Sequence, residues 1–241
     1  MQKSISSFLF VATVLMQPLC AHASSRYDFD AGFSDTFGTG PNLNPLGGTL
    51  SAGSYEFAPN QGLTLDWSSF DRATYDITLR FSFTTVGATA SWRKILDFDG
   101  RTTDEDLYVF NEHLQFVETT ASDGVETLIN GPAGTFSPNQ PVTLHLTRDG
   151  ATQLFSASLN NAPQFSFVDV NGRAIFSGIN PVATFFADDA VTNFTEASGG
   201  RVEFIAIGAV PVPAALPLLT SVLGVLGWQR HRNRRTDNVK C

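Results

Sequence analysis

Apolar and polar residues alternate along several short stretches of this chain of 241 residues. The clearest stretch is Tyr75–Phe83, where every second side chain is aromatic or aliphatic and the others are Asp, Thr, Arg and Ser. Strict alternation places the apolar side chains on one face of an extended strand and the polar side chains on the other. The pattern therefore predicts a strand with one buried face.

The same alternation recurs in stretches that are separated by turn residues. Residues 142–148 alternate, Asp149-Gly150 is a tight turn signal, and residues 152–159 return, so we expect a hairpin here. A second hairpin is expected in residues 107–117, and a last strand in residues 202–207. No stretch repeats its apolar residues at helical spacing over a useful length. These patterns predict an all-β fold, a single antiparallel β-sandwich of the jelly-roll type.

The N-terminus has the features of a signal peptide. Lys3 precedes an apolar stretch in residues 8–16, and Ala21-His22-Ala23 follows. These are the charged region, the apolar region and the small-residue cleavage site in their usual order. We expect cleavage after Ala23 and export from the cytoplasm.

The C-terminus has a short apolar stretch followed by clustered arginines. Residues 210–228 include no charged side chain, and about 20 such residues span a bilayer as a helix. The residues that follow hold the arginine cluster: Arg230, Arg232, Arg234 and Arg235. Clustered arginines stay on the cytoplasmic side of a membrane, so the preceding domain is expected to face outward from the inner membrane.

The prolines that precede the apolar stretch resemble a known sorting signal. Together with the stretch and the arginines, they are similar to the C-terminal signal of the PEP-CTERM group in its VPLPA-type variant: Val210, Pro211, Val212, Pro213 and Ala214, with Val212 where leucine is usual. The resemblance implies processing by an exosortase, an integral-membrane cysteine transpeptidase. It also implies release to the cell surface or extracellular matrix of a bacterium that makes exopolysaccharide. The alternative is a permanent tail anchor.

These features divide the chain into four predicted parts. They are a signal peptide (1–23), a β-sandwich domain (24–209), a sorting signal with a transmembrane helix (210–235) and a cytoplasmic tail (236–241). Both cysteines, Cys20 and Cys241, lie outside the predicted sandwich, which therefore does not depend on disulfides.

The charge of the predicted sandwich limits its partners. It holds 22 acidic residues against nine Lys and Arg, which gives a net charge of −13. Such a charge repels nucleic acid and anionic lipid. It suits a divalent cation or a neutral glycan, with plain solubility as the alternative, and we expect no nucleic-acid partner.

Four pieces of the domain resemble a laminin-G-like, concanavalin-A-type jelly roll. They are an aromatic strand (77–83), an acidic stretch (94–100), a hairpin (106–116) and a late acidic loop with its closing strand (184–205). The resemblance covers most of residues 63–208. It implies a lectin-like domain with a glycan or surface partner, and calcium often lies at the rim of such sandwiches.

Two acidic stretches hold the candidate calcium ligands: Asp97 and Asp99 in the first, and Asp188 and Asp189 in the second. Calcium takes six to eight oxygen ligands, so the two stretches form one site only if the fold brings them together. Solvated turn residues are the alternative, and no cofactor is certain.

No residue pattern indicates catalysis. Asp104 and Asp106 share a strand parity, but no Glu stands at the offset that jelly-roll β-glucanases use. We expect residues 104–106 to be an exposed turn in which water keeps the three carboxylates ionised. The histidines offer no triad. We therefore predict that the protein is not an enzyme.

Exposed aromatic side chains are the candidate platforms for sugar rings, namely Trp67, Trp92 and Tyr108. The favoured function is a non-catalytic, lectin-like protein of the cell surface or matrix, with exopolysaccharide or another surface glycan as its partner. A jelly-roll glycoside hydrolase or lyase, and a purely structural matrix protein, are the alternatives.

Overall fold

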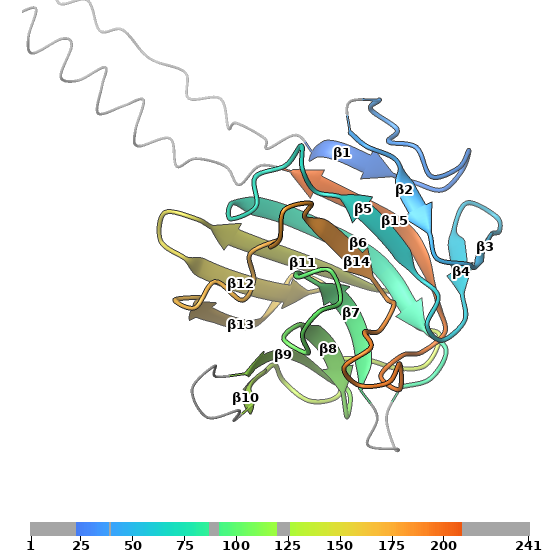
Figure 1. The fold of residues 1–241 in the computed structure, drawn as a ribbon. Helices are drawn as coiled ribbons and strands as arrows, with labels where there is room; N and C mark the ends of the chain where they lie inside the picture. Colours follow the sequence, from blue (N-terminus) through green and yellow to red (C-terminus); the bar gives the residue numbers. More distant parts are fainter. Residues whose placement is uncertain (1–22, 39, 87–91, 120–125, 209–241) are drawn as a thin grey trace, which may run out of the picture.

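The computed structural model describes residues 23–38, 40–86, 92–119 and 126–208, which form two antiparallel sheets that lie face to face (Figure 1). In order, one sheet contains β13 (Ala162–Val168), β12 (Leu154–Leu159), β11 (Val142–Asp149), β6 (Tyr75–Phe83), β15 (Gly200–Gly208), β4 (Tyr55–Phe57) and β3 (Thr49–Leu50), with β1 (Ala23–Tyr27) also paired to β15. The other contains β10 (Glu126–Asn130), β9 (His113–Thr119), β8 (Leu107–Phe110), β7 (Arg93–Asp97), β14 (Val182–Phe185), β5 (Leu63–Asp66) and β2 (Leu43–Pro45). The predicted all-β sandwich is confirmed.

The strand β6 lies at the centre of the eight-stranded sheet, between β11 and β15. Its burial alternates as the sequence predicts, with Tyr75, Ile77, Leu79, Phe81 and Phe83 buried. The polar side chains between them face outward. This sheet therefore presents a half-exposed polar face on the side away from the core.

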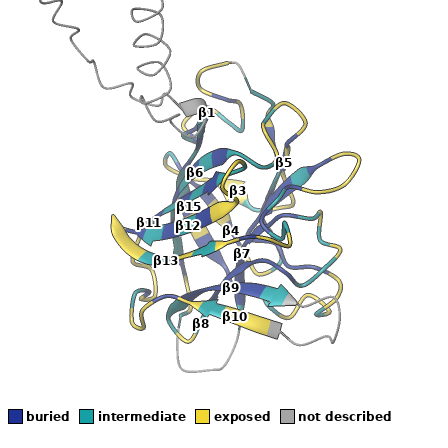
Figure 2. Cartoon of the chain, turned by 90° about the vertical axis from the view of Figure 1, so that its left-hand side faces the viewer, coloured by how far each residue is buried: buried dark blue, intermediate teal, exposed yellow. Residues whose placement is uncertain are grey.

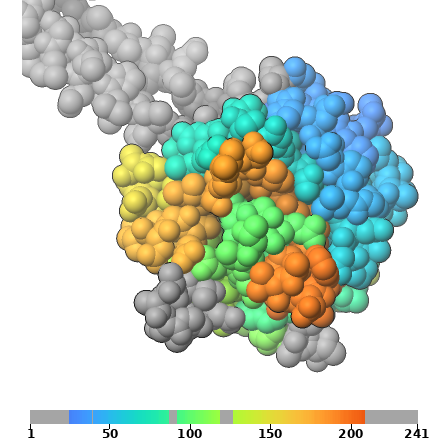
Figure 3. Space-filling model, in the orientation of Figure 1, coloured from blue at the N-terminus to red at the C-terminus, as the bar shows by residue number. Residues whose placement is uncertain are grey.

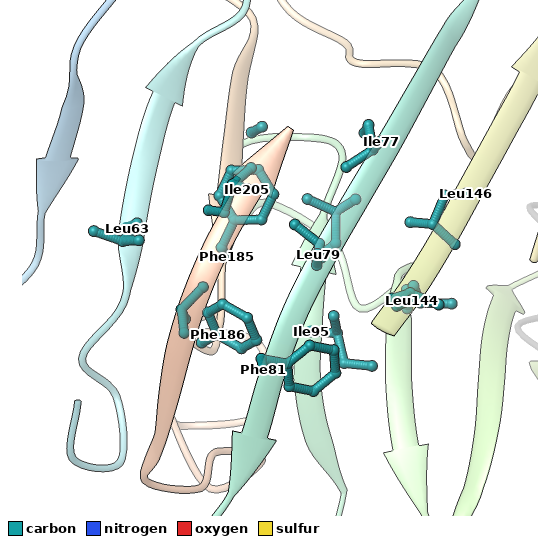
Figure 4. Close-up of a cluster of buried hydrophobic side chains, with 14 of the residues drawn as sticks. Leu63, Ile77, Leu79, Phe81, Ile95, Leu144, Leu146, Phe185, Phe186 and Ile205 are labelled. Atoms are coloured by element: carbon teal, nitrogen blue, oxygen red, sulfur yellow. The ribbon is translucent and has the colours of Figure 1, made fainter. Parts of the chain in front are cut away.

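The core lies between the two sheets. Figure 4 shows Leu79 and Phe81 of β6 close to Phe186 and Ile95, which come from the seven-stranded side. Burial of apolar surface of this kind is the main favourable contribution to folding. Within the described residues, the strands of both sheets pack on one shared core.

The two predicted hairpins form, with one difference in turn geometry. The β8–β9 hairpin turns through Asn111 and Glu112, which both have positive φ, as a two-residue hairpin turn requires. The β11–β12 hairpin was expected to turn at Asp149-Gly150. Instead, Asp149 is the last residue of β11, and the four residues 150–153 form the loop. The Asp149 carboxylate accepts hydrogen bonds from the amides of that loop, which favours the longer turn.

Apart from Ala23, which is the first residue of β1, the predicted sorting features lie outside the described residues. These are the signal peptide, the proline motif at Pro211 and Pro213, the apolar stretch and the arginine cluster, and they stay predictions. Within the described residues, no helix has the length and apolar character to cross a membrane. Ala23 pairs with Gly208, so the two ends of the sandwich lie side by side.

Candidate functional site

The strand β7 is buried on both of its faces, in contrast with the edge strand β13, which is mostly exposed or half-buried (Figure 2). Two loops cover the outer side of β7. We name them the first acidic loop (residues 97–106) and the second acidic loop (residues 186–199). Arg101 of the first donates to the backbone carbonyl of Asp188 in the second, and Figure 3 shows the two segments adjoining on the surface.

Lys94 of β7 lies beneath these loops and is fully buried. Its ammonium donates to Asp106 Oδ2 at 2.8 Å and to Asp189 Oδ2. Asp97 Oδ2 and Asp188 Oδ1 each lie 3.8 Å from the same nitrogen. Four buried carboxylates therefore surround one lysine, two from each acidic loop.

In each of the four carboxylates, one oxygen contacts the loop backbone and the other faces Lys94. One oxygen accepts a backbone amide: Asp97 from Arg101, Asp106 from Phe98, Asp188 from Glu196 and Asp189 from Val191. The other oxygen is the one that faces Lys94. The loop backbones thus hold every carboxylate in place, and the ammonium joins the two loops.

Two backbone irregularities bring these groups together. The pairing of β7 with β8 shifts register between Lys94 and Leu96, so Lys94 and Asp97 face the same side although strict alternation would separate them. Phe186 adopts a φ of 67°, which is rare for a bulky residue, and its amide donates to the Ile95 carbonyl. This turn directs the second acidic loop over β7.

The protonation states of the cluster follow from its burial. Burial alone lowers the pKa of Lys94, but hydrogen bonds to Asp106 and Asp189 and the charge of Asp97 raise it above its ordinary value. Burial raises the pKa of Asp97 to about 6, against the opposing charge of Lys94. Burial also raises the pKa of Asp106 well above its usual range, and the Asp97 carboxylate adds to this rise.

The candidate calcium ligands are brought together, but around an ammonium group. Asp97, Asp188 and Asp189 face Lys94, whereas Asp99 lies beside them with its carboxylate bound by Thr102 and Thr103. One oxygen each of Asp97, Asp99 and Asp106 lie within 4.8 Å of one another. Three oxygens are fewer than calcium takes, and both oxygens of Asp106 are already engaged. In this arrangement the residues do not fit a calcium ion.

The expectation that residues 104–106 form an exposed turn is wrong. Glu105 and Asp106 are buried, and the half-buried Asp104 accepts a hydrogen bond of 2.5 Å from the Tyr108 hydroxyl. Lys94 and the Phe98 amide both donate to the Asp106 carboxylate, which holds the end of the turn in the interior. Asp106 still has no access to a substrate, since both of its oxygens are engaged and its side chain is fully buried.

Two of the three residues predicted as exposed aromatic platforms are not exposed. Trp67 and Tyr108 are fully buried, so neither can stack on a sugar. Trp67 follows the buried Leu63 and Leu65 at the same two-residue spacing, so it points to the same side of the strand. This alternation in the sequence already indicated that Trp67 is buried. Trp92 is half-buried and stacks on Phe110 at 4.3 Å, so it alone of the three keeps some exposed surface.

A polar hollow of about 640 Å³ lies on the outer face of the eight-stranded sheet, and the sequence did not indicate it. Arg201 of β15 pairs in register with Glu56 of β4 on one side and with Ser82 of β6 on the other. Gln61 and Asn139 complete its polar rim. Gly200 is required in its floor, because a Cβ there would lie 2.3 Å from the Ser82 carbonyl oxygen.

Arg201 and Glu56 both have exposed side chains. Among the described residues, neither side chain makes a hydrogen bond or an ion pair, whereas every other lysine and arginine in that part of the chain is engaged. Elsewhere on this face, charges are paired, as in Arg80 with Glu203 at 2.6 Å. A free donor and a free acceptor thus stand side by side in one hollow.

A second, smaller hollow of about 340 Å³ lies on the same sheet. His145 and Thr147 of β11, Ser156 and Ser158 of β12 and Gln164 of β13 line it. The Asp76 carboxylate holds His145 at 3.0 Å. The outer face therefore offers hydrogen-bonding groups across most of its strands.

The fold and these hollows define a two-sheet β-sandwich with a polar outer face. No family model matches the sequence, and no curated protein matches it. The structure is similar to domain 4 of AbnA, a GH43 extracellular arabinanase from Geobacillus stearothermophilus solved with arabinotriose. The TM-score is 0.52 at 15% identity, over 79% of this chain and 95% of that chain.

Botulinum neurotoxin structures are also similar. One is of type C, whose cell entry depends on interaction with two ganglioside molecules (TM-score 0.58, 12% identity, 84% of this chain and 51% of that one). Another is the type DC binding domain in complex with SialylT (TM-score 0.55, 10% identity, 83% and 51%). The chain thus matches about half the length of the toxin chains. At these identities the likeness shows the fold alone.

The domain is expected to lose stability as pH rises from 5 to 8. Burial raises the pKa of Glu196 to about 8, with the Asp104 and Asp188 charges adding to the rise, and burial raises that of Asp97 to about 6. A carboxyl whose folded pKa is raised favours folding while it is protonated. That contribution is complete below the unfolded pKa and is lost as pH rises through the folded one. The raised pKa of His145, from its hydrogen bond to Asp76, gives a fall of the same sign.

Urea unfolding between pH 5 and pH 8 measures this loss. Glu196→Gln should make the fall shallower, whereas Glu56→Gln, an exposed carboxylate, should leave it unchanged. A free energy of unfolding that stays level or rises over this range would contradict the prediction.

Proposed function

We propose that the sandwich is a non-catalytic module that binds a neutral glycan in the hollow between Arg201 and Glu56. The observation that carries the proposal is that Arg201 and Glu56, two charged side chains without a partner among the described residues, face one hollow of about 640 Å³ on the polar face. Sugar hydroxyls both donate and accept hydrogen bonds. A guanidinium offers donors and a carboxylate offers acceptors, and such charge-assisted bonds are stronger than neutral ones.

The charge of the domain favours a neutral partner over an acidic one. Its net charge of −13 repels a polyanion, and Arg201 has Glu56 directly beside it. The similar arabinanase domain was solved with arabinotriose, and the similar toxin domain with SialylT. These neighbours support a glycan ligand. Because one fold hosts many functions, the hollow between Arg201 and Glu56 is the main support.

We also propose that the protein is exported, anchored transiently in the inner membrane and then processed by an exosortase at Pro211 and Pro213. The prolines and the arginine cluster in residues 230–235 support this proposal. A protein released to the cell surface or matrix should end within residues 210–215 by mass spectrometry. An intact Cys241 in the released protein would instead indicate a permanent anchor.

Binding is tested with residues 24–209 on an array of neutral and acidic glycans. Arg201→Ala and Glu56→Ala should each weaken binding of the neutral ligand by about 10-fold or more, because each removes a charge-assisted hydrogen bond. Arg72→Ala is the matched control, since Arg72 is an exposed arginine outside the hollow that donates to the Gly178 carbonyl. Equal loss in the control, or no loss in Arg201→Ala, would show that the glycan binds elsewhere.

A further inference from the structure

We propose that Lys94 is a built-in cation that takes the place of a divalent metal ion between the two acidic loops. The loops are then joined without calcium, and the domain does not depend on the calcium concentration outside the cell. This inference is independent of the proposed glycan function.

The arrangement of oxygens around Lys94 is that of a cation site. Four carboxylates turn one oxygen each toward the same point, and the four opposite oxygens are fixed by loop amides. Loops that hold carboxylates by their own amides and direct them at one centre are what a hard cation requires. Here the centre is the ammonium of a lysine on the strand beneath.

The ammonium forms hydrogen bonds with only two of the four carboxylates that face it. It donates to Asp106 and Asp189, while Asp97 Oδ2 and Asp188 Oδ1 lie 3.8 Å away and have no hydrogen-bond partner among the described residues. Both atoms are buried and directed at the centre. A larger charge with more ligands would engage all four oxygens, so the site retains the shape of a metal site although a lysine fills it.

A metal ion and the ammonium exclude each other. An ion at the centre would lie within a few ångströms of Nζ, where like charges repel strongly in a buried site. Lys94 has no exposed surface through which its ammonium could leave toward solvent without opening the loops. The aromatic ring of Tyr108 lies 5.1 Å from Nζ and favours a cation at this position.

Removal of the lysine side-chain charge should convert the cluster into a calcium site. Lys94→Met keeps the length of the apolar stem and leaves four carboxylates facing an empty centre. The thermal unfolding of this variant and of the wild type, both as residues 24–209, is measured in EDTA and in millimolar calcium chloride. Calcium binding to each protein is measured by calorimetry. The wild type should show no shift and no binding heat. Lys94→Met should melt lower in EDTA and rise by about 5–10 °C in calcium.

Two further variants control this result. Lys94→Met with Asp188→Asn should lose the calcium response, because Asp188 supplies one of the two free oxygens. Lys94→Met with Asp106→Asn keeps an amide oxygen in place of the buried Asp106 carboxyl and is used if the single variant does not fold without calcium; it too should be stabilised by calcium. Stabilisation of the wild type by calcium would overturn the proposal. A folded Lys94→Met protein that binds no calcium would overturn it equally.

Discussion

Replacing Trp67 by alanine is expected to lower the free energy of unfolding by about 3–5 kcal/mol. Trp67 is fully buried and stacks on Phe176, with ring centroids 3.8 Å apart. It also contacts Phe70 and Tyr75, and its indole N–H donates to the Asp71 carbonyl at 3.0 Å. Alanine leaves a large cavity at this end of the core and removes the hydrogen bond to the Asp71 carbonyl.

Urea unfolding of Trp67→Ala and Trp67→Phe measures the effect. Trp67→Phe keeps most of the ring contact and should lose less stability than Trp67→Ala. Neither variant should change glycan affinity under conditions in which it remains folded, since Trp67 has no exposed surface. Weaker binding by folded Trp67→Phe would restore Trp67 as part of the ligand site.

Arg148→Met is expected to cost a similar amount, about 3–5 kcal/mol, by leaving a buried charge without its partner. Arg148 and Asp169 are both buried, and the guanidinium donates to the carboxylate at 2.8 Å and to the Ala73 carbonyl at 2.7 Å. The same carboxylate accepts the amides of Arg173 and Ala174, so it holds the chain after β13 in place.

A second substitution separates lost charge from lost packing. Asp169→Asn keeps an acceptor for the Arg173 amide and removes the charge. Added to Arg148→Met, it should recover part of the lost stability in the same urea measurement. A double variant that is less stable than Arg148→Met alone would indicate that the ion pair is not the source of the effect.

Alternation predicted the long strands because each has one buried face. The burial of β6 and β11 was predicted correctly because their apolar residues face the core and their polar residues face outward. Arg148 occupies an apolar parity position in β11, which is the sequence signal of a buried ion pair. The two-residue strand β3, by contrast, has no pattern of its own and forms only by pairing with β4.

The acidic residues were recognised from sequence, but their environment was not. The burial of Lys94 depends on two loops that are about 90 residues apart in the chain, as its bonds to Asp106 and Asp189 show. Lys94 stands near the start of a strand beside apolar residues, and this local sequence does not indicate that two loops cover the side chain. Its register shift against β8 hides the shared face of Lys94 and Asp97 from any strict period-two analysis.

The hollow was missed for a related reason. Glu56 and Arg201 meet only because β4 pairs with the last strand, β15. Neither residue stands out in the sequence, and pairing between distant strands cannot be read from composition. What the sequence did supply was the alternation of β6, which predicts that the outer face of this sheet is polar.

The central claim is that the sandwich binds a neutral glycan without cleaving it. Retention on an insoluble neutral polysaccharide and release of reducing ends are measured together in one sample of residues 24–209. The account predicts saturable retention that Arg201→Ala weakens, with reducing ends constant over time. Reducing ends that increase with time would make the protein a hydrolase, and absence of retention on every neutral polysaccharide would favour a purely structural matrix protein.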